Sequence, residues 1–270
     1  MPRQFEDDDR VTVELGGNGV AQVRLARPDK LNALDPAMID RLIAAGQALH
    51  NLRGLRAVVI AGEGRGFCAG LDLAGFASGA EQEADGLIER TYGPANRFQQ
   101  AAMLWRKLPV PVVAAVHGVC FGGGLQIASG ADIRVAAPDA RLAIMEMKWG
   151  IVPDMGGFAL WRGLVRDDVL RELVYTNREF SGEEALALGF ATFTDADPLG
   201  RATAIAQEIA ARSPHAIRAA KHLANQAREL PTDAILVEES HAQHGLLFSK
   251  NQVEAVRSQV EGREPKFDDP

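Results

Sequence analysis

Short apolar runs and alternating stretches along the chain predict its β-strands. VTVEL and VAQVRLA, within residues 11–26, lie on either side of GGNG, which predicts a β-hairpin with a Gly/Asn turn. Residues 56–62 (RAVVIAG) and 109–118 (PVPVVAAVHG) are short apolar runs, which predict buried strands. Residues 132–137 (DIRVAA) predict one more strand.

A helical period appears between these strands. Apolar residues recur at helical spacing from Asp35 to Leu52, and Asp35 followed by Pro36 is typical of a helix start. Further helices are predicted around residues 99–107 and from the glycine run at residues 122–124. Strands that alternate with helices predict βαβ units with parallel pairing, and therefore an α/β fold.

The composition changes near Pro198, where Ala-rich sequence with helical character begins. Residues 197–213, residues 214–230 and a final stretch each predict a helix. We therefore expect a core over residues 1–197 and a helical appendage over residues 198–270.

The overall composition is that of a soluble globular protein. The chain has 270 residues, of which 47% are hydrophobic and 24% charged, and its net charge of −7 with no long basic run disfavours nucleic acid as a partner. No apolar run is long enough to span a membrane, the first ten residues lack a secretory core, and two cysteines suit a reducing compartment, so we expect a cytoplasmic protein. The six histidines show no metal-ligand spacing, so no metal site is predicted.

Two Gly-rich segments each follow a predicted buried strand. GFCAGLDL (residues 66–73) follows RAVVIAG, and FGGGLQ (residues 121–126) follows VVAAVHG. Glycine lets backbone come close to a ligand, and unpaired N–H groups at a strand-to-helix turn favour negative charge. Two such turns side by side could direct two N–H groups at one oxygen and form an oxyanion hole, although a plain tight turn is the alternative.

Two other motifs compete for these segments. Gly66-Phe-Cys68-Ala-Gly70 matches a nucleophile elbow with cysteine in place of serine, but LDLAGFASG is a poor continuation as a helix and no partner Asp and His are marked downstream. GEGRG resembles part of a dinucleotide fingerprint, yet the third glycine and the ribose-binding acid are missing. Neither alternative is favoured.

Two acids stand out in LAIMEMKWGIVPDMGG. Glu146 lies between apolar neighbours, and a carboxyl group that loses solvation there acquires a pKa suited to proton transfer. The alternative is a surface glutamate at the start of a helix. Asp154 follows Pro153 and precedes a Met-Gly-Gly turn, so ordinary turn chemistry also explains it.

Taken together, these motifs resemble the crotonase superfamily, the enoyl-CoA hydratase/isomerase family. The resemblance covers nearly all of the chain and is carried, in order, by RPDKLNAL, GFCAGLDL, HGVCFGGGLQIASGADIRVAAPDARL, MEMKWGIVPDMGG, SGEEALALGF and SPHAIRAAK. It implies a ClpP/crotonase-like ββα-superhelix core with C-terminal helices that mediate trimerisation, and an assembly that is a homotrimer or a dimer of trimers. It also implies an acyl-CoA thioester substrate and no cofactor apart from the CoA of that substrate.

The resemblance assigns roles to individual residues. The oxyanion donors would be the N–H groups of Ala69 and Gly123, Glu146 would be the catalytic acid or base, and Asp154 a second proton carrier. The substrate and CoA path would be lined by residues 30–34 and 69–73 and by the glycine run, in particular by Lys30, Ala33, Leu34, Ala69, Gly70, Leu71, Asp72, Leu73, Gly122 and Gln126.

Gln126 departs from the pattern of the family's hydratases, which carry a glutamate there. An amide can hydrogen-bond but cannot accept a proton from water, which disfavours hydration by two glutamates. The retained Glu146 and Asp154 resemble the acids of monoenoyl-CoA and dienoyl-CoA isomerases, so we expect a double-bond isomerase. The alternatives are a 2-enoyl-CoA hydratase that uses Glu146 alone and a non-catalytic acyl-CoA binder.

Overall fold

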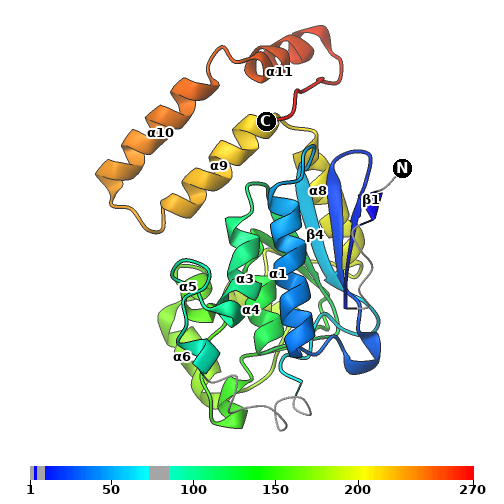
Figure 1. Cartoon of the computed structure of the whole chain (residues 1–270), viewed down its shortest axis with the longest axis vertical. Helices are drawn as coiled ribbons and strands as arrows, with labels where there is room; N and C mark the ends of the chain where they lie inside the picture. The colour runs from blue at the N-terminus through cyan, green and yellow to red at the C-terminus, as the bar shows by residue number, and fades with distance from the viewer. Residues whose placement is uncertain (1–2, 5–9, 73–84) are drawn as a thin grey trace.

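The computed structural model describes residues 3–4, 10–72 and 85–270. Its centre is a seven-stranded sheet in the order β1-β2-β3-β4-β5-β7-β10, which Figure 1 shows with helix α1 (Pro36–His50) in front of it. The strands of this sheet are β1 (Arg3–Gln4), β2 (Val11–Leu15), β3 (Val20–Leu25), β4 (Ala57–Gly62), β5 (Val112–Val116), β7 (Ile133–Ala136) and β10 (Phe193–Thr194).

The predicted hairpin and the predicted parallel pairing are both confirmed. Strands β2 and β3 pair antiparallel with Val13 opposite Val23, and β3, β4, β5, β7 and β10 then pair parallel in that order. Every residue of β4 and β5 is buried, as expected for parallel strands that are covered on both faces.

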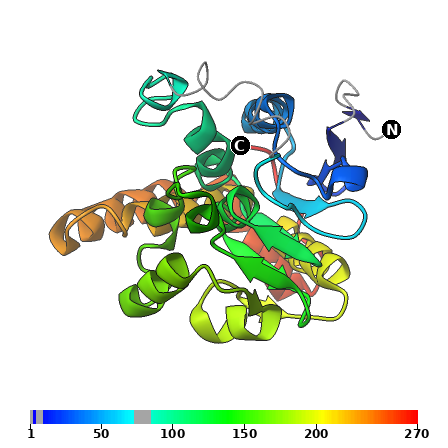
Figure 2. The same ribbon diagram turned by 90° about the horizontal axis from the view of Figure 1, so that it is seen from below.

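Helices cover the two faces of the sheet. Helices α1, α3 (Arg97–Lys107) and α4 (Gly123–Ser129) pack in the larger apolar core on one face, and α8 (Pro198–Ala210) packs on the other through Ala202 and Ile205. Figure 2 shows the strands between these two helical layers. Helix α1 begins as the sequence predicts, because Asp35 accepts a hydrogen bond from Met38 N and Pro36 takes the first helical position.

A smaller sheet and an isolated β-bridge lie where the two Gly-rich segments meet. Strand β6 (Val119–Phe121) pairs with β8 (Arg141–Ala143), which pairs with β9 (Phe180–Ser181). Single β-bridges join Cys68 to Cys120 and Leu34 to Leu71. The segments around residues 66–72 and 118–124 therefore lie side by side, as the two-turn interpretation requires.

The last three helices form an arm that projects from the body of the molecule at the top of Figure 1. They are α9 (Pro214–Gln226), α10 (Thr232–Leu246) and α11 (Lys250–Glu261), and α10 buries none of its residues. The predicted boundary at residue 198 needs correction, because α8 packs against β4 and β5 as part of the core. The change in packing comes after Ala210.

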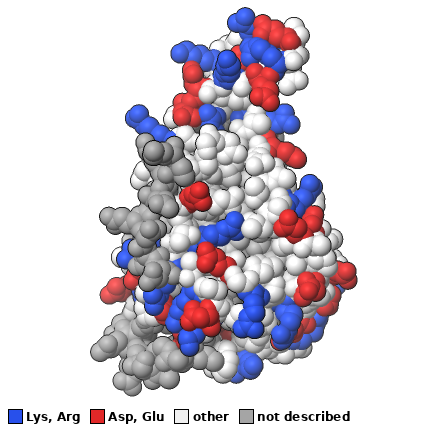
Figure 3. Space-filling model, turned by 90° about the vertical axis from the view of Figure 1, so that its right-hand side faces the viewer, with Lys and Arg blue, Asp and Glu red and all other residues white. Residues whose placement is uncertain are grey.

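Charges of both signs intermingle over the face drawn in Figure 3, including the arm at its top. Within the described residues, no helix is long and apolar enough to cross a bilayer. The cytoplasmic location stays a prediction.

The remaining elements are η1 (Pro28–Lys30), η2 (Asp85–Leu87), η3 (Glu146–Trp149), α5 (Gly157–Trp161), α6 (Asp167–Thr176) and α7 (Gly182–Leu188).

Candidate active site

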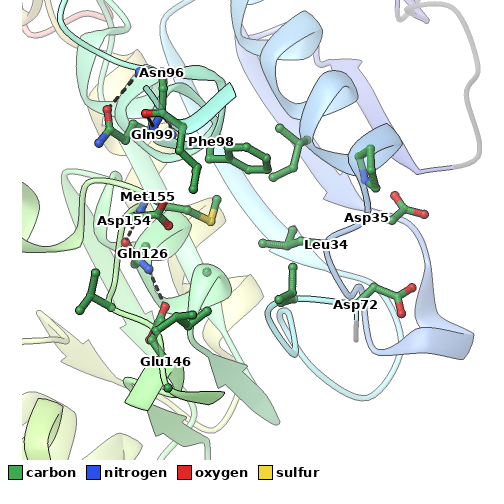
Figure 4. Close-up of a pocket in the computed structure, with 18 residues that line it drawn as sticks. Leu34, Asp35, Asp72, Asn96, Phe98, Gln99, Gln126, Glu146, Asp154 and Met155 are labelled. Carbon is green, nitrogen blue, oxygen red and sulfur yellow. Dashed lines mark hydrogen bonds between the residues drawn. The ribbon is translucent and has the colours of Figure 1, made fainter. Parts of the chain in front are cut away.

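A cavity of about 640 Å³ opens between α1, α3, α4 and the turn that follows η3. In Figure 4 the side chains of Gln126, Glu146 and Asp154 lie along one wall, and Leu34 and Asp72 lie on the opposite wall. Most of the side chains around the cavity are apolar, as is usual for a site that takes a small-molecule ligand. The lining residues are Leu34, Asp35, Pro36, Ile39, Leu71, Asp72, Leu87, Asn96, Phe98, Gln99, Gly123, Gln126, Glu146, Gly150, Ile151, Val152, Asp154 and Met155.

Glu146 is a buried acid on the wall of this cavity. It is the first residue of η3, directly after the buried Ile144 and half-buried Met145, and only 7% of its surface is exposed. Burial raises the pKa of Glu146 above its ordinary value, and the charge of Asp154 acts in the same direction. The carboxyl group predicted to be desolvated is therefore desolvated, and the upward direction of its pKa shift suits a group that exchanges protons.

Gln126 holds Glu146 through a buried hydrogen bond. Its Nε2 donates to Oε1 of Glu146 at 2.6 Å, and its Oε1 accepts from the backbone N–H groups of Met155 and Gly157, each at 2.9 Å. Gln126 lies in α4, with 1% of its surface exposed. The amide therefore links the acid to the turn that carries Asp154.

Asp154 is the second acid of the cavity. It is partly buried in the loop between η3 and α5, and burial raises its pKa. The charge of Asp154 raises the pKa of Glu146, so these two carboxyl groups are close enough to influence each other. The structure thus brings together the two acids predicted from the sequence.

The position of Gly123 has no room for a side chain. A Cβ at Gly123 would lie 2.7 Å from both Leu34 Cδ1 and Met155 Sδ, closer than van der Waals contact allows. Gly122, with φ of 48°, occupies the left-handed region that favours glycine, and a Cβ there would lie 3.3 Å from Glu146 Oε1. The glycine run therefore lets the start of α4 come close to Glu146 and to the cavity.

The backbone N–H groups of Leu71 and Gly123 have no acceptor among the described residues. Both residues line the cavity and come from the two adjacent Gly-rich segments. The predicted donor Ala69 needs correction, because its N–H donates to Leu31 O at 2.9 Å and Ala69 does not line the cavity. A bridge between Leu34 and Leu71 uses the groups on either side of Leu71 and leaves its own N–H unpaired.

Comparison with known proteins places this fold and this cavity in a family. The profile of the family described as Enoyl-CoA hydratase/isomerase matches residues 16–270. The chain belongs to this enoyl-CoA hydratase/isomerase family.

Relatives within the family differ in their named activities. The mouse protein named Delta(3,5)-Delta(2,4)-dienoyl-CoA isomerase, mitochondrial, is 30% identical over 98% of this chain and 84% of its own length. The Salmonella paratyphi A carnitinyl-CoA dehydratase is 33% identical over 94% of this chain and 97% of its own. The crystal structure of an enoyl-CoA hydratase from Bacillus anthracis superposes with a TM-score of 0.88 at 27% identity, covering 96% of this chain and 98% of the other.

The predicted crotonase-fold core is confirmed by these structures, and only some of the predicted site residues line the cavity. Lining the cavity are Leu34, Leu71, Asp72, Gly123, Gln126, Glu146 and Asp154. Lys30 is exposed in η1, whereas Ala33, Gly70 and Gly122 are buried behind the lining. Leu73 lies outside the described residues.

Residues 30–34 (KLNAL) hold the first Gly-rich segment in place through hydrogen bonds. Asn32 is fully buried with φ of 56°, accepts a hydrogen bond from Arg27 N, and donates to carbonyls that include Gly66 O at 3.0 Å. Asparagine tolerates this left-handed conformation better than most residues. Its neighbour Leu31 supplies the carbonyl that binds the Ala69 N–H. Asn32 therefore fixes the backbone that carries the Gly-rich segment.

Cys68 has no features of a nucleophile. Its Sγ donates to Asn32 O at 3.0 Å, and burial raises the pKa of this thiol to about 12. A reactive cysteine requires an accessible thiolate, so the nucleophile-elbow alternative is not supported.

The sequence did not predict the role of one lining residue, Leu71, or the presence of several others. Leu71 was placed on the substrate path but not identified as a donor, because the pairing of its neighbours with Leu34 is a tertiary contact. The outer wall, formed by Leu87, Phe98, Ile151 and Val152, consists of apolar residues that resemble any core position in the sequence. Val152 is apolar yet 59% exposed, which points to a place at the cavity, but exposure is known only from the structure.

Proposed function

We propose that this enzyme moves a double bond in an enoyl-CoA or dienoyl-CoA thioester by proton transfer through an enolate. The observation that carries this proposal is the hydrogen bonding of Gln126, whose amide donates to Glu146 and accepts from the backbone of Met155 and Gly157. An amide in that arrangement cannot activate water as a second carboxylate would. Glu146 and Asp154 remain as the two proton carriers at the cavity.

The proposed roles follow from the geometry. The N–H groups of Leu71 and Gly123 bind the thioester oxygen where negative charge develops. Glu146, as a carboxylate, removes a proton from a carbon next to the double-bond system and forms the enolate. Either Glu146 or Asp154 then returns a proton at another carbon. The apolar walls hold the acyl chain, and no cofactor is required other than the CoA of the substrate.

Turnover on three thioesters tests this proposal. We expect the wild-type enzyme to isomerise a 3-enoyl-CoA or a 3,5-dienoyl-CoA faster than it hydrates a 2-enoyl-CoA. Gln126→Glu should raise hydration relative to isomerisation, because it supplies the second carboxylate. Rapid hydration by wild type without isomerisation of either substrate would contradict the proposal.

A 2-enoyl-CoA hydratase that uses Glu146 alone is the second candidate. It is favoured by the similarity to the Bacillus anthracis enoyl-CoA hydratase structure and to the Salmonella carnitinyl-CoA dehydratase. The same three assays separate the candidates. Binding of all three thioesters without turnover of any would instead indicate an acyl-CoA binder.

The arm supports a second part of the proposal, a homotrimer or a dimer of trimers. Val253, Val256 and Val260 form an apolar stripe on α11 at helical spacing, with exposures of 49%, 54% and 83%. A second copy of the chain would bury this stripe. Val256→Asp with Val260→Asp should therefore shift the molar mass in light scattering towards that of the monomer. An unchanged mass would remove the stripe from the interface.

A further inference from the structure

The three hydrogen bonds of Gln126 fix which way its amide points. Its Oε1 receives two backbone N–H groups, from Met155 and Gly157, so this atom must be the oxygen. The group that faces Glu146 is then the NH₂ group, which only donates. The Glu146 oxygen opposite it is therefore always an acceptor.

We propose that Gln126 is a positioning residue that ties Glu146 to the 155–157 turn and holds its carboxyl group in one orientation without placing a second charge beside it. This inference rests on the role of Glu146 as proton carrier in the proposed function. It goes beyond that function by assigning the orientation of the acid to an uncharged residue on another element.

Orientation by Gln126 makes the two oxygens of Glu146 unequal. Oε1 accepts from Gln126, so the proton of the protonated acid resides on Oε2. Oε2 is buried and has no hydrogen-bond partner within the described part of the chain. The oxygen that carries the proton is thus the one without a hydrogen-bond partner among the described residues.

Close packing leaves Gln126 and Glu146 little freedom to move. A Cβ at Gly157 would lie 2.9 Å from Gln126 Oε1, and a Cβ at Gly122 would lie 3.3 Å from Glu146 Oε1. Both positions are glycine, so backbone closes directly around the pair. Rotation of Gln126 would leave the buried N–H groups of Met155 and Gly157 without an acceptor, and rotation of Glu146 would take the acceptor from Gln126 Nε2.

Among the described residues, Gln126 is the one side chain that donates a hydrogen bond to Glu146. The described charged groups near Glu146 do not bind it. Asp154 is the charged group that acts on Glu146, and it raises the pKa, whereas the bond from Gln126 lowers it. Asp72 on the opposite wall pairs with Arg27. On α6, which packs against η3, Asp167 pairs with Arg171 at the surface. The other charged residues near this turn also lie at the surface: Lys148 lies over Trp149, Glu172 pairs with Arg178, and Arg141 pairs with Glu179.

Two substitutions separate the two functions of the amide. Gln126→Met is similar in size but removes both the donor to Glu146 and the acceptor for the turn. Gln126→Glu keeps an acceptor for Met155 N and Gly157 N but replaces the donor with a carboxyl group, which adds a like charge beside Glu146. Gln207→Met, at an exposed position on α8, is the matched control.

The decisive measurement is the titration of Glu146 by carboxyl ¹³C NMR, with its resonance identified by its absence in Glu146→Gln. We expect the pKa of Glu146 to rise by about one unit in Gln126→Met and by more in Gln126→Glu. In Gln126→Met the acidic limb of the kcat/KM profile should rise with it, kcat should fall about tenfold or more, and KM should change little. Gln207→Met should match the wild type.

An unchanged Glu146 titration in both variants would overturn the proposal, and so would a change confined to KM. The NMR titration does not depend on turnover. If wild type proves to be a hydratase while the titration shifts as expected, the reaction assignment fails and the positioning role stands. If wild type isomerises and the titration does not shift, the reaction assignment stands and the positioning role fails.

Discussion

The cavity wall and the C-terminal arm depart from the usual burial pattern in opposite directions: the wall buries polar side chains, and the arm exposes apolar ones. At the cavity, polar side chains such as Gln126 are buried and held by hydrogen bonds from residues distant in sequence. On the arm, apolar side chains such as Leu236 and Val260 are exposed, and α10 buries nothing. Buried polar groups and exposed apolar stripes are the two informative exceptions to the usual pattern.

The two regions differ in whether one chain supplies the partners of their side chains. The burial of Gln126 on the wall is explained within one chain, because Glu146, Met155 and Gly157 of that chain are its hydrogen-bond partners. The arm leaves its apolar stripe uncovered within one chain, which is why we propose a second copy as its partner. Side chains of α9 tie the arm to the core, and the most deeply buried of them is Lys221, which donates to Trp105 O, Val110 O and Asp132 Oδ2.

The largest expected effect is on the wall, at its acid. Glu146→Gln should lower kcat by about 10²- to 10⁴-fold, because it removes the group that exchanges protons. Binding of a CoA thioester and the circular dichroism spectrum should be unchanged, since Gln126 can still donate to the new amide oxygen. Undiminished turnover would exclude Glu146 from the mechanism.

The next effect concerns the backbone donor opposite Glu146. Leu71→Pro removes one N–H group and should lower kcat by about 10²- to 10³-fold on the best substrate. Leu71→Ala keeps the N–H, so the ratio of the two variants in the same assay isolates the amide. An equal loss in both would place the hole elsewhere.

The contact of Lys221 between the arm and the core is expected to affect stability. Lys221→Met removes a buried ammonium group and leaves Asp132 without its ion-pair partner, which should lower the free energy of unfolding by about 3 kcal/mol in a denaturant titration. Lys250→Met, at an exposed lysine of α11, should change it by less than about 0.5 kcal/mol. Similar values for both lysines would show that Lys221 does not anchor the arm.

The smallest expected effect is a pH dependence of stability. Burial raises the pKa of Glu146 in the folded protein, so its ionisation opposes folding: the stabilisation is complete below the unfolded-state pKa and is lost as the pH rises through the folded one. Glu146→Gln should therefore raise Tm relative to wild type at pH 8 and have a smaller effect at pH 5, as measured by calorimetry. Glu239→Gln, on the exposed surface of α10, should leave Tm nearly unchanged at both values. A lower Tm for Glu146→Gln at pH 8 would reverse the assigned sign.

The local elements, the family and the two acids could all be predicted from the sequence. The N-cap at Asp35, the hairpin at residues 11–25 and the buried strand β4 follow from patterns within a few residues of each other. Glu146 and Asp154 were identified because their motif and its spacing lie in one continuous segment. These features depend on short-range chemistry, which a sequence displays directly.

Only the tertiary structure decided what each group contacts. Gln126 meets Met155 and Gly157 from about 30 positions away, and the Ala69 N–H is taken by Leu31 because two distant loops lie side by side. Helix α8 has the same Ala-rich character as the arm, yet it joins the core because the open face of β4 and β5 receives it. Whether an N–H group is free, an amide donates or a helix is buried depends on which surfaces the fold brings together, and no local pattern encodes that.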